Sequence, residues 1–516
     1  MKTFWFFAAL GQSEEGFKMK RTIRNILCFA LAALMAITSA SVAFAKESVV
    51  PVILVHGLGA NPVYENVGTA NQKEIKNLGL GDDIASAILK NNDLICEVLK
   101  MMEPERDVDE DKLINSLAAM TASSNLNCDK DGNVPAGQGI VNYWTDPLSK
   151  HKDYYQNAEV AESAIARQLV KEVGAKNVYC FNYDWRQDIC KTAKDLRDYI
   201  KKIKKQTKSS KVSLVGCSLG GAVLSAYIDA YKGEKDVKRY VFVNPAIMGV
   251  DVSRAYALDI KFSKKEIVKY LNCMETAYNN GSSATLFRLI YALGDVKIGY
   301  AADYLNSFVK NKKNVKKLFN TAIKPWIGNI PSLWECIPYD SFDKAVKEMS
   351  GIGFLDKNSG MYKKIKKYHA VQGRLRKNLK AVKKNGSAVA IIASYGTMGI
   401  PVTSKANNQT DVLIDTKYAS GGATVAQYGK KLSKKNAKGK YVSPDKVINA
   451  KTCALPDNTW FIKDVQHMRF KFDSGATKLV ARLATGKVKS DIKSVKKKYK
   501  LSQFVRETKD NKLKNI

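Results

Sequence analysis

Short apolar runs and segments of helical periodicity alternate along most of this chain. The apolar runs, each long enough for a buried strand, lie at 49–55, 177–181, 212–217, 237–243, 387–394 and 459–462. Between them, apolar residues recur every three or four positions at 159–173 and 196–205, which is typical of helices packed on a core. Because the strands are apolar on both faces, the pattern predicts a mostly parallel central sheet flanked by helices.

The pattern changes in two long segments. The segment 247–385 contains helical periods but no convincing buried strand; the periods lie at 263–278, 284–293 and 361–382. We therefore predict a helical cap at 247–385, inserted between two strands of the sheet, and a lid-like insertion at 61–156. The core of the fold then consists of 46–246 and 386–486, and a basic C-terminal tail follows at 487–516.

The first 45 residues have the three parts of a secretory signal peptide. A basic segment at 19–24 precedes an apolar stretch at 26–40 and the small-residue sequence Ala43-Phe44-Ala45. The chain is therefore predicted to be exported and to act as a secreted or cell-surface protein, and the order of the three parts favours Met19 as the translation start. An uncleaved membrane anchor is the alternative, although the apolar stretch is shorter than the roughly 20 residues that span a bilayer.

The chain is strongly basic, with a formal net charge of +35 over 516 residues. Its lysines are spread over the whole length without an arginine-rich recognition helix or zinc-finger spacing, so nucleic acid is not an expected partner. A basic surface suits an anionic membrane or cell-wall polymer, and the tail at 487–516 is interpreted either as an anchor to such a surface or as a solvated helix. The oligomeric state stays open.

The sequence shows no pattern of metal ligands. Its four histidines lie far apart, and no C-x-x-C occurs. The segment 127–132 imitates the start of a calcium loop, but Gln138 stands where that loop needs a glutamate, so we expect a polar surface turn. We expect no metal and no cofactor. Eight cysteines follow position 45, and this even number permits disulfides, such as Cys180 with Cys190 or Cys96 with Cys128, without requiring them.

The strand at 212–217 ends in Gly216-Cys217-Ser218-Leu219-Gly220, and a helix rich in small residues follows at once. This is the G-x-S-x-G pattern of a nucleophile elbow, in which a serine sits on a sharp strand-to-helix turn and glycines allow close approach of the backbone. Ser218 is therefore the predicted nucleophile.

Another apolar strand, ahead of the elbow, ends in His56-Gly57. In serine hydrolases with such an elbow, this turn supplies one backbone N–H to the oxyanion of the reaction, and the residue after the nucleophile supplies the other. We predict Leu58 and Leu219 as the two donors.

A late histidine completes the pattern. In this class of site the groups follow the chain order serine, acid, histidine, and only His467 comes after an acid carried on the loop that follows the strand at 387–394. His467 is therefore the predicted general base.

Four motifs together resemble those of one family. They are PVILVHG at 51–57, YDWR at 183–186, GCSLGG at 216–221, and YGT at 395–397 followed by Pro401 and Thr403. With them the chain, over about 49–470, resembles bacterial members of the lecithin:cholesterol acyltransferase family, which comprises lipases, phospholipases and acyltransferases. The resemblance implies the α/β-hydrolase fold and a structural or pocket-supporting role for Asp184 and Arg186. Of the aromatic residues in the predicted cap, Trp326 and Trp334 are candidates for a substrate pocket, with ordinary core packing as the alternative.

The chain departs from this family at the acid. The family aspartate lies in a G-D-G-T-V turn, and the segment with the most similar letters, at 420–425, has Gly422 in its place. A second segment, Thr410-Asp411-Val412-Leu413-Ile414, resembles the S-D-G-V turn of related secreted lipases. We predict Asp411 as the triad acid, with Asp415 as the fallback.

These expectations describe a secreted serine esterase or lipase that acts on lipid or phospholipid esters through an acyl-enzyme, with O-acyl transfer to an alcohol as a further activity. The alternative is a catalytically weakened hydrolase fold that binds anionic surface or membrane polymers, which the glycine at position 422 motivates. The sequence does not decide between hydrolase and acyltransferase, nor among head groups and chain lengths.

Overall fold

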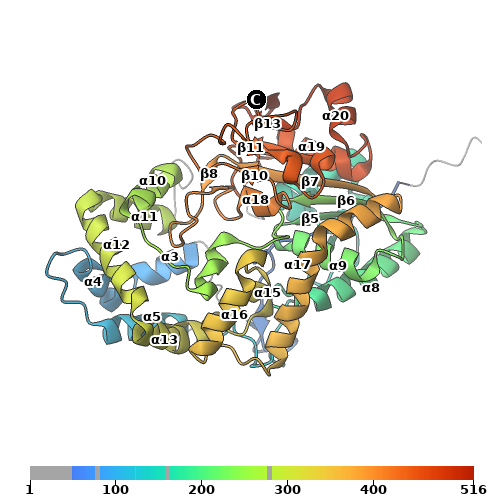
Figure 1. The fold of residues 1–516 in the computed structure, drawn as a ribbon. Coiled ribbons are helices and arrows are strands. Elements are labelled where there is room, and N and C mark those ends of the chain that lie inside the picture. Colours follow the sequence, from blue (N-terminus) through green and yellow to red (C-terminus); the bar gives the residue numbers. More distant parts are fainter. Residues whose placement is uncertain (1–48, 76–81, 123, 158–161, 276–281) are drawn as a thin grey trace, which may run out of the picture. The chain divides into compact units, whose positions relative to one another are not determined.

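The computed structural model describes residues 49–516 apart from 76–81, 123, 158–161 and 276–281, so the predicted signal peptide lies outside the described residues. Its centre is an eight-stranded sheet with the strand order β14-β13-β12-β7-β6-β5-β1-β4 (Figure 1). The strands are β1 (Val52–Val55), β4 (Val178–Phe181), β5 (Val212–Cys217), β6 (Val237–Val243), β7 (Ala388–Tyr395), β12 (Thr459–Lys463), β13 (Phe504–Glu507) and β14 (Leu513–Asn515). All neighbours pair in parallel except β13 and β14, which confirms the predicted mostly parallel sheet of an α/β fold.

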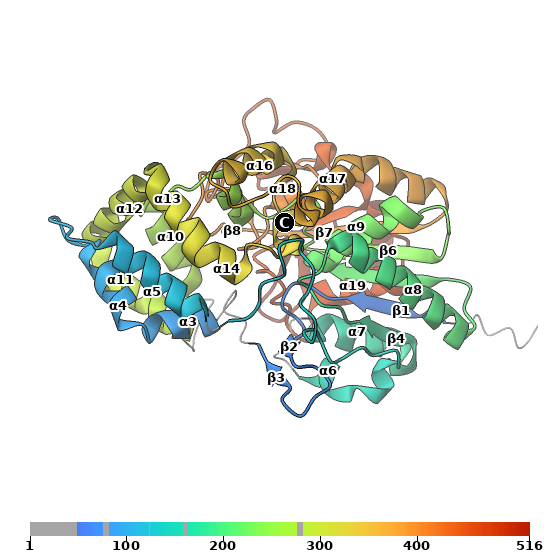
Figure 2. The ribbon, with the colours of Figure 1, turned by 90° about the horizontal axis from the view of Figure 1, so that it is seen from below.

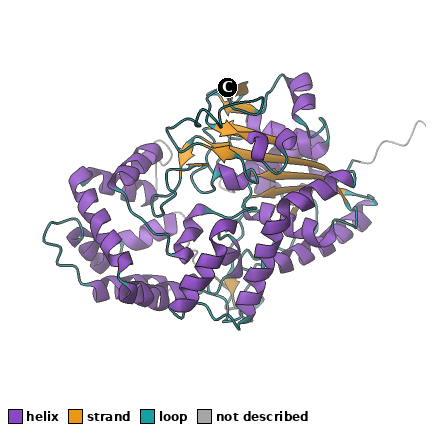
Figure 3. Ribbon diagram, in the orientation of Figure 1, coloured by secondary structure: helices purple, strands orange, loops and turns teal. Residues whose placement is uncertain are grey.

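Both faces of the sheet are apolar because neighbouring residues of a strand point to opposite sides. Leu214 of β5 lies in one hydrophobic cluster and Val215 in another. The first cluster includes side chains of α8 (Ile189–Thr207), α9 (Leu219–Tyr231) and α17 (Gly360–Lys384). The second includes side chains of α7 (Ser163–Val173) and α19 (Gly475–Thr485). Figure 3 shows helices on either side of the strands.

Helices from the two predicted insertions pack together in one helical lobe (Figures 1 and 2). The segment 61–156 contributes α3 (Asp82–Leu89), α4 (Asn92–Lys100) and α5 (Glu110–Ala122). The segment 247–385 contributes α10 (Lys264–Glu275), α11 (Ser282–Ala292), α12 (Gly294–Lys310) and α13 (Lys312–Leu318). Leu94 of α4, Ile114 of α5 and Phe308 of α12 lie in one buried cluster, so the two insertions share a core.

Shorter elements complete the described chain. The helices are α6 (Lys152–Gln156), α14 (Lys324–Ile327), α15 (Pro331–Glu335), α16 (Phe342–Gly351) and α18 (Thr416–Ala419). Three two-stranded pairs join β2 (Tyr64–Glu65) with β3 (Lys73–Glu74), β8 (Thr397–Met398) with β9 (Gln409–Thr410), and β10 (Thr424–Val425) with β11 (Ile448–Asn449).

The segment 487–516, predicted as a basic tail, belongs to the sheet. It forms α20 (Ile492–Tyr499) and then β13 and β14, and the ring of Phe504 stacks on that of Phe461 with 5.5 Å between centroids. The strand at 459–462 is therefore not the last strand of the sheet. The prediction was wrong because lysines outnumber the few apolar residues here, and a four-residue strand leaves too short a pattern to detect.

The cysteines at positions 96, 128, 180, 190, 217, 273, 336 and 453 are free thiols, so the conceivable disulfide pairs do not form in this structure. In the described parts of the chain, no helix combines the length and the apolar character that crossing a bilayer requires.

Candidate active site

The G-x-S-x-G segment folds as a sharp turn between β5 and α9. Ser218 at this turn has φ of 52° and ψ of −118°, which residues with a side chain rarely adopt. A Cβ at Gly220 would lie 2.2 Å from the carbonyl oxygen of Val55, and one at Gly221 would lie 2.3 Å from Cβ of Pro245. Both glycines are therefore needed for the turn to pack against β1 and the loop after β6.

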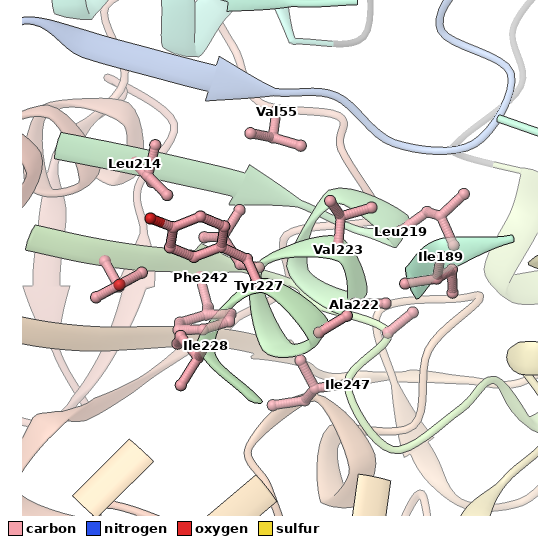
Figure 4. Close-up of a cluster of buried hydrophobic side chains, with 14 of the residues drawn as sticks. Val55, Ile189, Leu214, Leu219, Ala222, Val223, Tyr227, Ile228, Phe242 and Ile247 are labelled. Atoms are coloured by element: carbon pink, nitrogen blue, oxygen red, sulfur yellow. The ribbon is translucent and has the colours of Figure 1, made fainter. Parts of the chain in front are cut away.

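Apolar side chains anchor both arms of the turn. The close-up in Figure 4 shows Leu214 on β5 and Val223 and Tyr227 on α9, packed with Ile189 and Ile247 from the neighbouring elements. All five are almost fully buried. A residue held in an unfavourable backbone conformation persists only where its surroundings fix it, and this cluster supplies that constraint for Ser218.

The turn places Ser218 next to the late histidine. Nε2 of His467 lies 3.0 Å from Oγ of Ser218, and Nδ1 of His467 lies 2.7 Å from Oδ2 of Asp411. Ser218 is 7% exposed and Asp411 is 1% exposed. The structure thus brings three sequence-predicted residues into one hydrogen-bonded chain in the order serine, histidine, acid.

The turn after β9 presents Asp411. Its Oδ1 accepts the backbone N–H groups of Leu413 (3.1 Å) and Ile414 (2.7 Å), while its backbone carbonyl accepts the N–H of His467 (2.6 Å). These bonds leave Oδ2 for the imidazole and hold the two residues together through their main chains as well. Val412, next in the chain, has φ of 92°, an unfavourable value for a β-branched residue.

The two predicted oxyanion donors flank the serine. Leu219 is the first residue of α9, where N–H groups have no partner within the helix. Leu58 follows Gly57, at which a Cβ would lie 3.0 Å from Cβ of Ser218 and 3.5 Å from its Oγ. The loop after β1 therefore passes directly beside the nucleophile.

Glu162 was not found from the sequence. Its Oε1 accepts the N–H of Gly57 at 2.9 Å, so it fixes the loop that carries Leu58. Glu162 is 1% exposed, and its Oε2 has no hydrogen-bond partner among the described residues. Burial raises the pKa of its carboxyl, and the hydrogen bond from Gly57 opposes this rise. No local signal reveals this contact, because Gly57 and Glu162 are 105 positions apart.

His56 supports the same loop from inside the core. Its ring stacks on that of Tyr183 at 4.1 Å, Nδ1 donates to the carbonyl of Gly57, and Nε2 accepts from Asn61 and from the N–H of Tyr183. Burial lowers the pKa of His56 to about 4, so the ring is neutral at neutral pH. Its place is structural, since its nitrogens bind the scaffold and not Ser218.

Asp184 and Arg186 of the YDWR motif form a fully buried, two-pronged ion pair. Nε and Nη2 of Arg186 lie 3.0 and 2.8 Å from the two carboxylate oxygens. Nη1 donates to the carbonyl of Leu126 and to Gln138, which lie in the segment 61–156. The pair therefore ties that insertion to the sheet, which agrees with the structural role implied by the family resemblance.

Asp415, the predicted fallback acid, caps a helix and does not contact His467. Oδ1 of Asp415 caps α18 by accepting the N–H of Lys417 (2.9 Å), and Oδ2 accepts from Asn408 (2.7 Å), so neither oxygen contacts His467. Burial raises the pKa of Asp415 to about 6. It lines a polar cavity of about 310 Å³ together with Arg254, and Ser218, Asp411 and His467 are not among the residues that line this cavity. Gly422 donates its N–H to the carbonyl of Lys417.

The two tryptophans predicted to line a substrate pocket lie in different surroundings. Trp334 is fully buried, its Nε1 donates to the carbonyl of Gly328 at 2.9 Å, and its ring stacks on Tyr256. Trp334 thus packs in a core, which was the alternative to its place in a pocket, because the helical segment 247–385 is large enough to bury aromatic residues of its own. Trp326, in α14, is partly buried and remains a prediction.

The calcium-like loop holds a lysine. Nζ of Lys364 lies 2.8 Å from the carbonyl oxygens of Asp131 and Gly132 and 2.6 Å from Oδ1 of Asn133. The loop is therefore a turn that binds the ammonium group of Lys364 through three of its oxygens. In the described residues, no group of three or more His, Cys, Asp or Glu side chains is arranged to bind a metal ion.

Comparisons with known proteins add little to this geometry. No protein-family model matches the chain, and no curated protein matches it. Among solved structures, the chain is similar to one described as the crystal structure of the Tle4-Tli4 complex. The TM-score is 0.34 and the identity 12%, over 85% of this chain and 98% of the other. A likeness at this level assigns no family, so a function must be inferred from the geometry of the site.

Proposed function

We propose that this protein is a serine esterase or lipase of the α/β-hydrolase type, with Ser218 as nucleophile, His467 as general base and Asp411 as the acid. The observation that carries the proposal is the continuous chain from Oγ of Ser218 through the imidazole to Oδ2 of Asp411, with contacts of 3.0 and 2.7 Å. Nucleophile and base within hydrogen-bond reach, with a third group orienting the base, is the arrangement that activates a serine.

The steps follow from these contacts. Nε2 of His467 takes the proton of Ser218 as Oγ attacks the ester carbonyl, and Asp411 holds Nδ1–H so that Nε2 is free to do so. The N–H groups of Leu58 and Leu219 stabilise the oxyanion. The protonated imidazole then donates to the departing alkoxide, which leaves an acyl ester on Ser218. Water or an alcohol, deprotonated by His467, cleaves this ester and restores the serine.

A lipid or phospholipid ester is the proposed substrate, and the helical lobe is proposed as lid and cap. Large apolar side chains at the junction of α11 and α12 support this: Leu289 and Tyr291 are each 52% exposed, and Val296 is 63% exposed. Export through the predicted signal peptide is part of the proposal. The catalytic proposal is favoured over an inactive binding protein because Asp411 contacts His467 although Gly422 stands at the family position of the acid.

Labelling with a fluorophosphonate probe tests the nucleophile. The wild-type protein should be labelled, and Ser218→Ala should abolish labelling and lower ester turnover by at least about 10⁴-fold. Ser213→Ala is the matched control, since Ser213 is a buried serine of β5, the strand that leads to Ser218, and its hydroxyl has no hydrogen-bond partner among the described residues. A folded wild-type protein that is not labelled would refute the proposal. Products from a phospholipid panel, with and without added alcohol, then distinguish hydrolysis from acyl transfer.

A further inference from the structure

Helix α17 carries a row of lysines without acidic neighbours in the helix. Its 25 residues include ten lysines and arginines and no aspartate or glutamate. Six lysines are exposed and form no ion pair within the described residues: Lys363, Lys366, Lys367, Lys377, Lys380 and Lys384. At 100° and 1.5 Å per residue, they fall in an arc of about 140° and extend over about 30 Å. The row is therefore a one-sided band of positive charge.

The other four basic residues of α17 have structural partners. Arg374 forms two hydrogen bonds with the carboxylate of Asp229, Arg376 donates to the carbonyl of Thr452, and Lys383 donates to Asn458. Lys364 occupies the loop at 129–133 described above. One ion pair and several hydrogen bonds thus account for these four cations, but no such contact accounts for the six in the row.

An exposed aromatic residue lies within this row. The ring of Tyr339 stacks on His369 of α17 at 4.7 Å and is 42% exposed. A Cβ at Gly373 would lie 3.2 Å from the Tyr339 hydroxyl. Gly373 falls inside the arc of the lysines, between Lys367 and Lys377. The tyrosine therefore interrupts the row with lysines on both sides of it.

Helix α8 adds a second row to the same face of the sheet. Lys194, Lys201, Lys202 and Lys205 are exposed and form no ion pair within the described residues, and one exposed carboxylate, that of Asp198, lies among them. Both α8 and α17 pack on α9, and Figures 1 and 2 show α17, α9 and α8 in succession on this face. The lysines of α17 and α8, with α9 between the two helices, thus form a broad basic area.

We propose that this face of α17 and α8, with Tyr339, binds the surface of an anionic phospholipid bilayer. A broad area of lysines matches a plane of negative head groups, and each lysine near such a surface adds to the attraction. Tyrosine has an apolar ring and a polar tip, which suits the boundary between head groups and acyl chains. Binding through this face needs no catalysis, so it stands or falls independently of the proposed esterase activity.

Sedimentation with vesicles tests the proposal. The full chain carrying Ser218→Ala, which cannot degrade the lipid, is mixed with vesicles of phosphatidylcholine alone or with 30% phosphatidylglycerol. We expect at least tenfold tighter binding to the anionic vesicles, and weaker binding as salt is raised. Replacing Lys363, Lys366, Lys377 and Lys380 by glutamine should weaken this binding at least tenfold.

The matched control removes the same charge elsewhere. Glutamine at positions 430, 431, 434 and 435, four exposed lysines of the loop after β10, should change binding by less than about threefold. Equal losses in the two variants would overturn the proposal, because net charge alone would then explain binding. Tighter binding to soluble polyphosphate than to anionic vesicles would also overturn it, in favour of a polymer. Thermal melting followed by circular dichroism checks folding, and Tyr339→Ser provides a milder variant that should still weaken vesicle binding.

Discussion

Two turns bring the proposed reacting groups together, and they are built differently. At the nucleophile turn, Gly220 and Gly221 stand where any Cβ would collide with neighbouring main chain or Pro245. At the acid turn, Val412 has φ of 92°, where a glycine would be unstrained. Val412 packs beside a cluster that includes Tyr270 and Met274 of α10. Glycines and the sheet core together hold the first turn, whereas the second has no glycine at Val412 and packs beside the helical lobe.

The largest expected effect is a loss of kcat on replacing Asp411, and replacing Asp415 in the same turn should not cause it. Asp411→Asn should lower kcat by about 10⁴-fold, because the amide no longer holds the imidazole in the tautomer that accepts the serine proton. Asp415→Asn should leave kcat within about threefold of wild type, since its oxygens contact Asn408 and Lys417. Steady-state turnover of a soluble ester measures both. The reverse result would transfer the role of acid to Asp415.

The sequence predicted the parts of the fold whose signal is local. Six strands and the elbow at Ser218 follow from apolar runs and glycine spacing, and chain order singled out His467. Asp411 could be placed only by resemblance to a turn in which valine replaces the expected glycine. Glu162 could not be found at all, because its role depends on a contact with Gly57 that only the folded chain creates. The strands after Lys500 were hidden by the surrounding lysines.

Glu162 supports the loop beside the nucleophile turn, and its replacement should have the next largest effect on kcat. Glu162→Ala removes the acceptor of the Gly57 N–H, which loosens the loop that carries Leu58, so we expect kcat to fall by about 10- to 100-fold with little change in KM. Glu162→Gln retains an oxygen for this bond and should recover most of the activity. Kinetics on a soluble ester across this pair measure the effect.

A second buried glutamate controls for this experiment. Oε2 of Glu335 accepts the N–H of Ile189 at 2.9 Å, Oε1 has no partner among the described residues, and the residue is 2% exposed. Glu335→Ala therefore removes a similar buried bond that does not involve the loop carrying Leu58. Because Ile189 packs in the cluster around the nucleophile turn, this variant should lower the melting temperature, and it should lower kcat much less than Glu162→Ala does. Equal losses of kcat in Glu162→Ala and Glu335→Ala would show that Glu162 acts only through the stability of the fold.

Asp415 makes the acid turn sensitive to pH. Its pKa is raised to about 6 from the ordinary 3.8 by burial, so its contribution to stability is present below about pH 4 and is lost as pH rises through 6. The loss is on the order of 2–3 kcal/mol at pH 7.5. Asp415→Asn removes this titration, so the variant should gain stability over wild type as pH rises from 4 to 7.5. Denaturant melts at both pH values measure the difference, and a constant difference would contradict the prediction.

The smallest effect tests the strain at Val412 directly. Glycine and alanine both remove the packing of this side chain, but only alanine keeps a Cβ at φ of 92°, which costs about 1–2 kcal/mol for such a conformation. Val412→Gly should therefore be more stable than Val412→Ala by about 1 kcal/mol, which reverses the usual advantage of alanine. Leu413, which lacks a positive φ, is the matched position, and there alanine should be the more stable residue. Urea unfolding of the four variants measures this reversal. If alanine is the more stable residue at both positions, the acid turn is not strained at Val412, and its packing against α10 is what holds it.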